Sequence, residues 1–503
     1  MIKTSPPVGS YLDVAYDSTD RLTQVTYPSG RTVDYTRNSL GQVASASTTA
    51  NSVTTPLASN LAYLPFGPLS GGSYGNGLAH SRSFDQDYRL TALATGTVQS
   101  LSYTLNAVNN ITAMTNTLDA SRNQSFSYDA LNRLTGASGI YGTEAYTYDA
   151  NGNRLTSTIN SFPETYTYDT VSHHLLQTVN GGTRNYSYDG NGNTTDNGNR
   201  QFTYGDHNRL KEAQVSGSPV ATYTYNGRGE RVKKVGTETT LYFYDQGGQL
   251  LAETDAFGNT LKEYLYVDGQ PLAQVSNGVV YYVHTDHLGT PQLITDATQA
   301  IVWSADYTPF GNVNITTQTV TNNLRFPGQY FDAETNLQYN YFRDYDPSTG
   351  RYIENDPIGL KGGLNTYAYV DSNPLRHIDP TGQSALSNVL PWAGGAAVAD
   401  GPLPIGDIIG GLLLGGALIY DLCEESVTEK CQKQLDEELE RCDHDFGMWG
   451  RANHVYQGCR QRAWERFRLC VRNGGSMPPD APGPWSEPDV DGWPTIHDKQ
   501  PKR

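Results

Sequence analysis

Aromatic and polar residues alternate along the first half of the chain in short runs that recur at a fixed distance. The runs FSYDALNRLTG, YTYDANGNRLTST, YTYDTVSHHLLQT and YSYDGNGNTTDN place their second aromatic residue at Tyr128, Tyr148, Tyr168 and Tyr188, a period of twenty residues. Residues i and i+2 of a strand point to the same face of a sheet, so each aromatic pair marks one packed face. The pattern therefore predicts β-strands organised as a repeat array.

Weaker copies extend the repeat in both directions. They centre on Tyr16, Tyr35, Phe84 and Tyr103 before the strict run, and on Tyr204, Tyr225 and Tyr244 after it. In each unit an Asp-containing turn with Gly or Asn, which tolerate positive φ, leads to a return strand such as the one that starts at Arg154. Each unit is thus interpreted as one hairpin. A lone hairpin is marginal in water, so we expect the hairpins to pair edge to edge in one long sheet with the tyrosines in register.

The period alone also fits a Tyr-rich β-solenoid or sandwich of any kind. Longer motifs point to one particular family. The pattern Y-D-x-x-N/G-R-L resembles the YD repeat of the Rhs and teneurin families, whose repeats wind a β-sheet into a spiralling hollow shell. Residues 281–313, around HTDHLGTP, are similar to the Rhs signature, and residues 324–382 are similar to the Rhs-associated core that closes the shell. On these motifs the chain is identified as a member of the Rhs/YD-repeat family of polymorphic toxins, as a C-terminal portion.

The resemblance implies a mainly β fold. We expect a partial spiral shell of YD-repeat β-hairpins, closed by an Rhs-associated core and followed by a small α-helical C-terminal domain. The predicted segments are YD/Rhs repeats at 1–280, the core with an autoprotease motif at 281–382, an apolar Gly-rich segment at 383–420, a Cys-containing helical hairpin effector at 421–475 and a Pro/Gly-rich tail at 476–503.

The charge of the chain limits its partners. The formal net charge is −17 and only 17% of residues are charged, so the shell offers no wide basic surface and is not expected to bind nucleic acid. The first twenty residues hold no apolar stretch of the kind found in signal peptides. We therefore expect export without a cleavable signal peptide. No cofactor is expected either.

The motif Asp-Pro-x-Gly occurs twice, beginning at Asp356 and at Asp379. Each copy alone favours a type I turn, because Asp caps such a turn and Pro presets its φ angle. The pair also suggests catalysis. Two carboxylates held close together repel each other, which raises the pKa of one, so that one acts as an acid while the other activates water. The twenty-three residues between them allow a strand and a return.

The Rhs core resembles an aspartyl autoprotease, and this resemblance assigns roles to five residues. Asp356 and Asp379 would be the catalytic pair and Arg343 their upstream partner, with the scissile bond between Gln383 and Ser384. Family members usually carry Leu where this chain has Gln383.

Two histidines, His284 and His287, lie in HTDHLG with a spacing of three residues. Without a further clustered ligand this spacing is weak evidence for a metal, so a structural role in the shell wall is favoured and no metal site is predicted.

Beyond residue 383 the composition changes. The uncharged run from Ile408 to Tyr420 has thirteen residues, fewer than the roughly twenty that a membrane-spanning helix needs. We expect a buried or shell-packed helix. The alternative is a segment that inserts into the membrane of a target cell, because its glycines would allow close helix packing.

All five cysteines lie in the last part of the chain. Cys431 and Cys442 are eleven residues apart, as are Cys459 and Cys470, so each pair lies along one face of a predicted helix. An antiparallel hairpin of the two helices would match Cys442 with Cys459 and Cys431 with Cys470, and would leave Cys423 unpaired. Such disulfides need an oxidising compartment, which fits a protein that acts outside its producer.

A zinc site is the alternative for these cysteines. Its ligands would be Cys442, His444, His454 and Cys459, in a spacing that is not a common zinc-finger pattern. The second helix is basic and complements the acidic first helix, so the arginines are expected to face that helix and not nucleic acid.

The function that the resemblance implies is that of a Rhs-type polymorphic toxin fragment. It would encapsulate a variable C-terminal effector, release it by aspartyl autoproteolysis and serve interbacterial competition. The implied partners are a cognate immunity protein, a secretion-system spike or adaptor, commonly of type VI secretion, and the target-cell membrane. The protein would be secreted or cell-associated, with its effector delivered to the target cell. The alternative is a non-toxic YD-repeat surface protein for adhesion or carbohydrate binding, or a degenerate displaced cassette.

Overall fold

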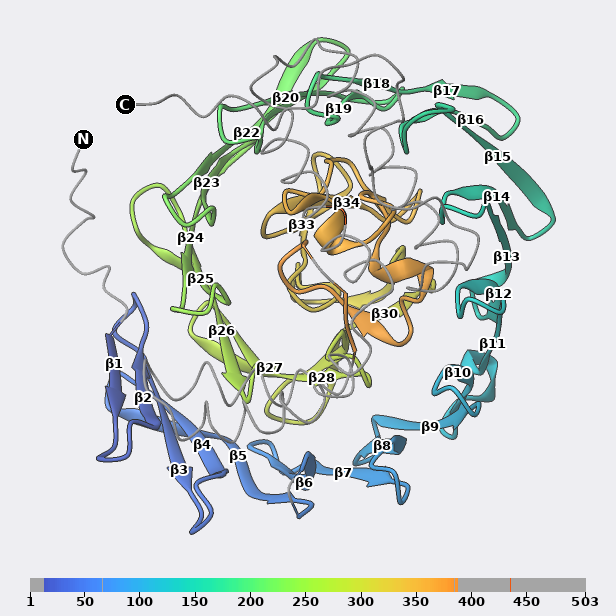
Figure 1. The fold of residues 1–503 in the computed structure, drawn as a ribbon. Coiled ribbons are helices and arrows are strands. Elements are labelled where there is room, and N and C mark those ends of the chain that lie inside the picture. Colours follow the sequence, from blue (N-terminus) through green and yellow to red (C-terminus); the bar gives the residue numbers. More distant parts are fainter. Residues whose placement is uncertain (1–12, 66, 384, 388–434, 436–503) are drawn as a thin grey trace, which may run out of the picture. The chain divides into compact units, whose positions relative to one another are not determined.

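The computed structural model describes residues 13–65, 67–383, 385–387 and 435. Within them nearly all regular structure is antiparallel β-sheet, and each strand of the two large sheets pairs with its neighbours in the sequence. The sheets contain 17 and 14 of the described strands. Figure 1 shows these strands following one another around a smaller central sheet. The predicted meander of hairpins is confirmed, but it forms two long sheets instead of one, with the break at Tyr186 between β17 and β18.

The strands of the first sheet are β1 (Asp13–Tyr16), β2 (Leu22–Thr26), β3 (Thr32–Arg37), β4 (Val43–Ala50), β5 (Val53–Tyr63), β6 (Leu69–Tyr74), β7 (Ala79–Phe84), β8 (Leu90–Thr95), β9 (Gln99–Leu105), β10 (Ile111–Asn116), β11 (Gln124–Tyr128), β12 (Leu134–Gly139), β13 (Gly142–Tyr148), β14 (Arg154–Ile159), β15 (Phe162–Tyr168), β16 (Leu175–Val179) and β17 (Thr183–Asn185).

The strands of the second sheet are β18 (Ser187–Tyr188), β19 (Thr194–Asp196), β20 (Gln201–Tyr204), β21 (Leu210–Val215), β22 (Ser218–Tyr225), β23 (Arg231–Val235), β24 (Thr239–Tyr244), β25 (Leu250–Thr254), β26 (Thr260–Val267), β27 (Gln270–Ser276), β28 (Val279–Thr285), β29 (Pro291–Thr295), β30 (Ile301–Tyr307) and β31 (Val313–Gln318).

The remaining elements are short. They are the four-stranded sheet of β32 (Tyr330–Asp332), β33 (Leu337–Asn340), β34 (Arg343–Asp346) and β35 (Arg351–Tyr352), the pair β36 (His377–Ile378) and β37 (Leu386–Ser387), and the 3-10 helices η1 (Ala120–Arg122), η2 (Gly359–Gly362) and η3 (Val370–Ser372). Among the described residues no helix has the length and apolar character needed to cross a bilayer. Apart from residues 383, 385–387 and 435, the predicted Gly-rich segment and α-helical C-terminal domain lie outside the described residues.

The Asp of each repeat closes its hairpin. Asp149 Oδ1 accepts the backbone N–H groups of Asn151 at 2.8 Å and Asn153 at 2.9 Å, and the N–H of Gly152 donates to the Asp149 carbonyl at 3.3 Å. Gly152 has φ +80°, which favours glycine at that position. Asp129 and Asp189 accept bonds in the same way. One carboxylate per repeat therefore fixes the turn that the sequence predicts.

The tyrosines join successive repeats. Tyr146 is buried against Phe126 and Leu134 of the preceding hairpin, whereas the hydroxyl of Tyr148 donates to the Leu134 carbonyl at 2.7 Å. The same bond to a carbonyl of the preceding hairpin recurs at Tyr128 to Ile111, Tyr188 to Leu175, Tyr204 to Thr194, Tyr244 to Arg231 and Tyr266 to Leu250. The first tyrosine of a pair thus supplies apolar packing, and the second holds the register between hairpins.

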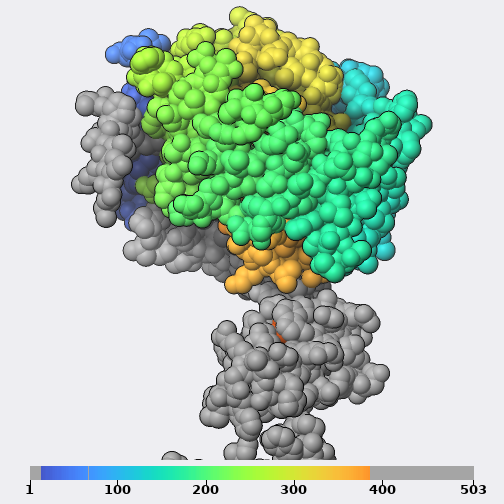
Figure 2. Space-filling view, turned by 90° about the horizontal axis from the view of Figure 1, so that it is seen from above, coloured from blue at the N-terminus to red at the C-terminus, as the bar shows by residue number. Residues whose placement is uncertain are grey.

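The two large sheets touch through the first strands of the chain. The hydroxyl of Tyr27 donates to the Tyr264 carbonyl at 2.8 Å, and Arg31 pairs with Glu263 at 2.8 Å, both largely buried. A shared apolar cluster around Val33 and Leu265 surrounds these contacts. In the space-filling view the green and teal repeat strands form a continuous surface, and the orange end of the described chain reaches that surface at one edge (Figure 2).

The four-stranded sheet β32–β35 contacts both large sheets. Arg231 of β23 forms a buried ion pair with Asp332 of β32, and Lys234 reaches the same carboxylate at 2.9 Å. On the side of the first sheet, the guanidinium of Arg351 in β35 donates to the His173 carbonyl at 2.7 Å. These polar contacts fix the position of the small sheet against segments that lie about a hundred residues or more away in the sequence.

A pair of carboxyl groups lies fully inside the small sheet. Asp344 and Glu354 are 1% and 2% exposed, and Glu354 Oε2 accepts the backbone N–H of Asp344 at 2.8 Å. Burial raises the pKa of Asp344 to about 6, and burial together with the neighbouring Asp344 raises the pKa of Glu354 well above its ordinary value. One proton shared by the pair removes the repulsion that two buried carboxylates would have.

Replacing Tyr148 by Phe tests the register bond. The change keeps the ring and leaves the Leu134 carbonyl without its partner, so we expect a loss of about 1 kcal/mol in the free energy of unfolding. Urea denaturation followed by circular dichroism measures it. The matched control is Tyr88→Phe. Tyr88 is 42% exposed, so water replaces the hydrogen bond that its hydroxyl made and the loss of stability should be small. Equal losses in the two variants would contradict the register role.

Replacing Glu354 by Gln tests the buried pair. A carboxyl group whose pKa is raised by folding contributes stability at low pH, and this contribution is lost as the pH rises from the unfolded pKa to the folded pKa. Glu354→Gln removes one such group and should therefore stabilise the protein more at pH 8 than at pH 5, as measured by denaturant midpoints at both values. The control is Glu238→Gln at an exposed position, which should show no such difference. If Glu354→Gln showed none either, the shared proton would be excluded.

Candidate functional site: a buried aspartate pair

Short elements of the small sheet and of the pair β36–β37 position the three residues that the sequence predicts to be catalytic. Arg343 opens β34, Asp356 follows β35 after three residues, and Asp379 follows β36 directly. Exposures of 3%, 4% and 2% show that all three are buried. Three parts of the sequence therefore supply one charged group each to a single dry location.

The structure brings these three groups into contact. One terminal guanidinium nitrogen of Arg343 lies 2.9 Å from Asp356 Oδ2 and 3.5 Å from Asp379 Oδ2. The other terminal nitrogen donates to the Thr366 carbonyl at 2.9 Å, and Nε donates to the Gly382 carbonyl. Because both carboxylates contact the same nitrogen, they face each other across a single positive charge.

The two Asp-Pro-x-Gly motifs adopt different local structures. In the first, Asp356 Oδ1 accepts the N–H of Ile358 at 2.9 Å and the N–H of Gly359 returns to the Asp356 carbonyl at 2.9 Å, as the turn prediction requires. In the second, the chain bends and Asp379 Oδ1 accepts the N–H of Gln383 at 3.0 Å. The carboxylate of the second motif thus holds the residue that precedes the predicted scissile bond.

The carbonyl oxygen of Gln383 and the carboxylate of the first aspartate both lie next to Gly362. A Cβ atom built on Gly362 would collide with Asp356 Oδ2 and would lie 2.6 Å from the Gln383 carbonyl oxygen. Gly362 therefore leaves a small space that the carboxylate and the carbonyl share, and any side chain there would fill it.

A short strand pair fixes both ends of the loop that carries Gln383. His377 and Ile378 pair antiparallel with Ser387 and Leu386. The chain on the far side of the predicted cleavage position thereby returns to the strand that precedes Asp379. Between these strands, the N–H of Gln383 donates to Asp379 Oδ1, so Gln383 is held next to one of the two carboxylates. Ser384 itself lies outside the described residues.

Two further polar side chains contact the pair, and sequence analysis did not identify either of them. The hydroxyl of Tyr352 donates to Asp379 Oδ2 at 2.8 Å. The amide of Asn340 donates to the Tyr352 oxygen at 2.7 Å and to the Asp379 carbonyl at 2.8 Å. The only signal in the sequence that could have pointed to Tyr352 is its position next to Arg351 and four residues before Asp356.

The electrostatics of the site favour one neutral carboxyl. Burial raises the pKa of Asp356, Arg343 opposes this rise, and the nearby Asp379 adds to it. A raised pKa on one member of an aspartate pair is what general acid catalysis near neutral pH requires. The arrangement can therefore supply an acid and a base to one peptide bond.

The two histidines of HTDHLG take part in packing. His284 is fully buried, its Nε2 lies 2.8 Å from Thr295 Oγ1, and burial lowers its pKa to about 3. His287 Nε2 lies 2.8 Å from the Leu375 carbonyl. Among the described residues no cluster of three or more potential ligands could hold a metal ion. The disulfide candidates Cys431, Cys442, Cys459 and Cys470 and the alternative zinc ligands lie outside the described residues.

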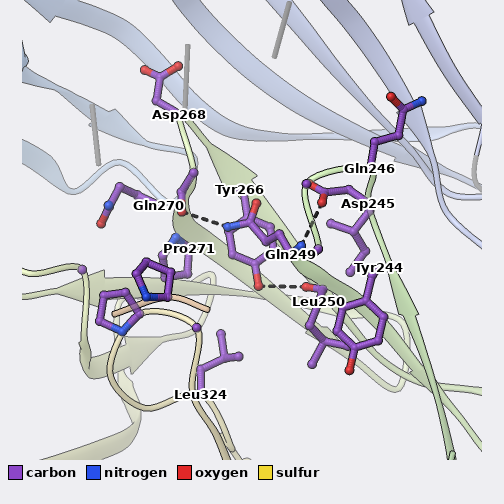
Figure 3. A pocket seen from close by; sticks show the side chains of 18 of the residues that line it. Tyr244, Asp245, Gln246, Gln249, Leu250, Tyr266, Asp268, Gln270, Pro271 and Leu324 are labelled. Carbon is purple, nitrogen blue, oxygen red and sulfur yellow. Dashed lines mark hydrogen bonds between the residues drawn. The ribbon is translucent and has the colours of Figure 1, made fainter. Parts of the chain in front are cut away.

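A separate cavity of about 380 Å³ lies behind the loop of the second motif. Its walls come from β1 to β4, from β24 to β26 and from Pro380 and Thr381. Figure 3 shows Tyr266 bonded to the Leu250 carbonyl and Gln249 bonded to Asp245 within this cavity. None of the three predicted catalytic side chains is among the described residues that line it.

Two family models match the chain. The Teneurin YD-shell model matches residues 79–374, and the RHS Repeat model matches residues 16–54. The first match alone covers more than half of the chain and includes both Arg343 and Asp356.

Curated relatives include proteins named as toxins. The chain is 31% identical over 236 residues to Double-stranded DNA deaminase toxin A of Burkholderia cenocepacia, which is 39% of this chain and 16% of the relative. It is 31% identical over 268 residues to tRNA nuclease WapA of Bacillus subtilis, covering 51% of this chain and 12% of the relative. It is 39% identical over 127 residues to Toxin protein Tse5 of Pseudomonas aeruginosa, covering 24% and 10%. The chain thus matches less than a fifth of the length of each of these relatives.

Solved structures share the fold. The Tc holotoxin pore of Photorhabdus luminescens matches with a TM-score of 0.65 and 20% identity, over 75% of this chain and 21% of that chain. The TcdB2-TccC3 crystal structure matches with a TM-score of 0.64 and 19% identity, over 74% and 22%. The mainly β shell predicted from the repeats is therefore confirmed.

The repeat-built sheets, the small sheet inside them and both family models agree with the resemblance found in the sequence. This chain belongs to the Teneurin YD-shell family of RHS and YD-repeat proteins.

Proposed function

We propose that this chain is the shell and self-cleaving core of a Rhs-type toxin, and that it cuts itself between Gln383 and Ser384. The observation that carries the proposal is the buried contact of Arg343 with both Asp356 and Asp379, at 2.9 and 3.5 Å. Cleavage there separates residues 384–503 as the effector.

The chemistry follows from the shared contact. An aspartate pair hydrolyses a peptide bond when one carboxyl is protonated and the other is ionised, and a single guanidinium between them lowers the cost of the charged form. The backbone N–H of Gln383 donates to Asp379 Oδ1 at 3.0 Å, which holds the Gln383 carbonyl near the pair. The substrate is part of the same chain and does not have to diffuse to the site. An intramolecular substrate held in this way reacts with a large effective molarity.

The toxin role rests on the relatives. Three relatives with 31 to 39% identity carry the word toxin or nuclease in their names, and their named activities differ from one another. A shared shell with differing activities supports a variable C-terminal effector that acts in interbacterial competition. Such a protein needs a cognate immunity protein in the producer and a secretion-system spike or adaptor. It is exported and delivers its effector into, or across the membrane of, a target cell.

Asp356→Asn should abolish self-cleavage. The substitution keeps the shape and removes the proton donor, so the purified variant should run as one band, whereas the natural chain of 55.1 kDa should run as fragments of about 42 and 13 kDa. Denaturing gel electrophoresis makes the measurement. The control is Asp346→Asn, a buried aspartate of the same strand as Arg343 that caps a neighbouring turn, and this variant should still cleave. Normal cleavage of the Asp356 variant would refute the assignment.

Expression of residues 384–503 alone should arrest growth of a bacterial host. The arrest should depend on the compartment that the effector acts in, so the segment is expressed both with and without an export signal, and culture density is followed. The control is the full-length Asp356→Asn chain, which should be tolerated because its effector stays attached to the shell. Growth without arrest in both compartments would favour the alternative, a non-toxic YD-repeat surface protein or a displaced cassette.

A further inference from the structure

The hydroxyl of Tyr352 makes the two aspartates unequal. Tyr352 is only 1% exposed, and its hydroxyl donates to Asp379 Oδ2 at 2.8 Å. Asn340 donates to the same tyrosine oxygen at 2.7 Å, so that oxygen already accepts one bond and its own proton is directed to the carboxylate. The contacts found for Asp356 include no such hydroxyl; its Oδ1 accepts only the backbone N–H of Ile358 at 2.9 Å.

Arg343 alone does not explain which of the two aspartates is ionised. Its guanidinium lies nearer to Asp356, at 2.9 Å, than to Asp379, at 3.5 Å, and would favour an ionised Asp356 if it acted alone. On the Asp379 side two further donors are present, the Tyr352 hydroxyl and the Gln383 N–H at 3.0 Å. Hydrogen bonds to a carboxylate stabilise its charged form, and the two further donors add to the contact that Arg343 makes with Asp379.

We propose that Tyr352 is a positioning residue that keeps Asp379 ionised, so that the proton of the pair resides on Asp356. The proposal rests on the self-cleavage proposed above and assigns the two roles within it. Asp379 is the base that activates water, and Asp356 is the acid.

The position of the Gln383 carbonyl agrees with these roles. The space left by Gly362 is bounded both by Asp356 Oδ2 and by the Gln383 carbonyl oxygen. The protonated carboxyl therefore lies beside the oxygen that gains negative charge during attack. Burial also raises the pKa of Asp356, which favours its neutral form.

The reaction then proceeds in two balanced steps. Asp379 takes a proton from a solvent water while the water oxygen bonds to the Gln383 carbonyl carbon, and Asp356 gives its proton to the carbonyl oxygen. In the second step Asp379 gives its proton to the Ser384 nitrogen, the carbon–nitrogen bond breaks, and one hydroxyl of the intermediate returns a proton to Asp356. The products are a carboxylic acid at Gln383 and an amine at Ser384, and both aspartates regain their starting states.

The ring of Tyr352 makes a contact of its own, which a substitution can separate from the role of the hydroxyl. The Arg343 guanidinium carbon lies 3.6 Å from the centre of this ring, which is a cation–π contact. Tyr352→Phe keeps this contact and removes only the hydroxyl. The other charged or titratable groups that face Asp379 are Arg343 from β34, Asp356 from the first motif and Tyr369.

The test is the pH dependence of self-cleavage in Tyr352→Phe. The full chain is made by cell-free synthesis, shifted into buffers from pH 4 to pH 9, and the uncut fraction is followed on gels. Without the hydroxyl the proton moves more readily to Asp379, so the acidic limb of the rate profile should shift upward by about one pH unit. Cleavage on the acidic side should therefore slow by about tenfold, with a smaller effect at neutral pH. Incorporation of 3-fluorotyrosine at position 352, a stronger donor of the same shape, should shift the limb downward.

The matched control is Tyr345→Phe. Tyr345 lies in the same buried aromatic cluster, and its hydroxyl donates to the Phe310 carbonyl at 2.8 Å and not to a carboxylate. This variant loses a buried hydrogen bond of equal length and should keep the natural pH profile. A Tyr352→Phe profile identical to that of Tyr345→Phe, or a fluorotyrosine chain without a shift, would overturn the role of Tyr352 and leave self-cleavage intact. If the unsubstituted chain does not cleave at all, the proposed function itself fails.

Discussion

The structure depends on one constraint: a two-stranded hairpin with a single aromatic face cannot bury that face alone. Six of the described repeats meet this constraint with a hydrogen bond from the hydroxyl of the second tyrosine to a backbone carbonyl of the hairpin before it, as Tyr148 does with Leu134 at 2.7 Å. The bond fixes register, and register decides which side chains face inward, because a slip of one residue would turn every aromatic ring to the other face. The long sheets are therefore a chain of nearest-neighbour contacts, each of which can form only when its neighbour is in place.

The candidate site depends on the rigidity of the large sheets that surround it. The small sheet is only four strands wide, and its strands have two to four residues, which would be marginal in isolation. Polar contacts with the large sheets, such as the Arg231–Asp332 ion pair and the bond from Arg351 to the His173 carbonyl, hold it in place. An aspartate pair can share a proton in a defined way only if its groups are held to within a few tenths of an ångström and kept dry. The wall thus encloses the site and also keeps its geometry fixed.

Sequence analysis was informative where local spacing carries the structure. The alternation of Tyr146 and Tyr148, the turn at Asp149 and the return strand at Arg154 depend on residues within one hairpin, and all three predictions are confirmed. The break at Tyr186 was not predicted, because the repeat pattern continues through it without a change in spacing. The cysteine and helix predictions fall outside the described residues and stay predictions.

The site shows the same division. The doubled motif led to Asp356 and Asp379, and the family resemblance added Arg343, but Tyr352 and Asn340 join the site only through folding. The central claim is that the buried pair Asp356 and Asp379 cuts the chain at one place. The intact masses of the purified full-length protein test this claim most directly. The account predicts two masses, one ending at Gln383 and one beginning at Ser384. A single mass for the uncut chain, or a cut at another bond, would contradict it.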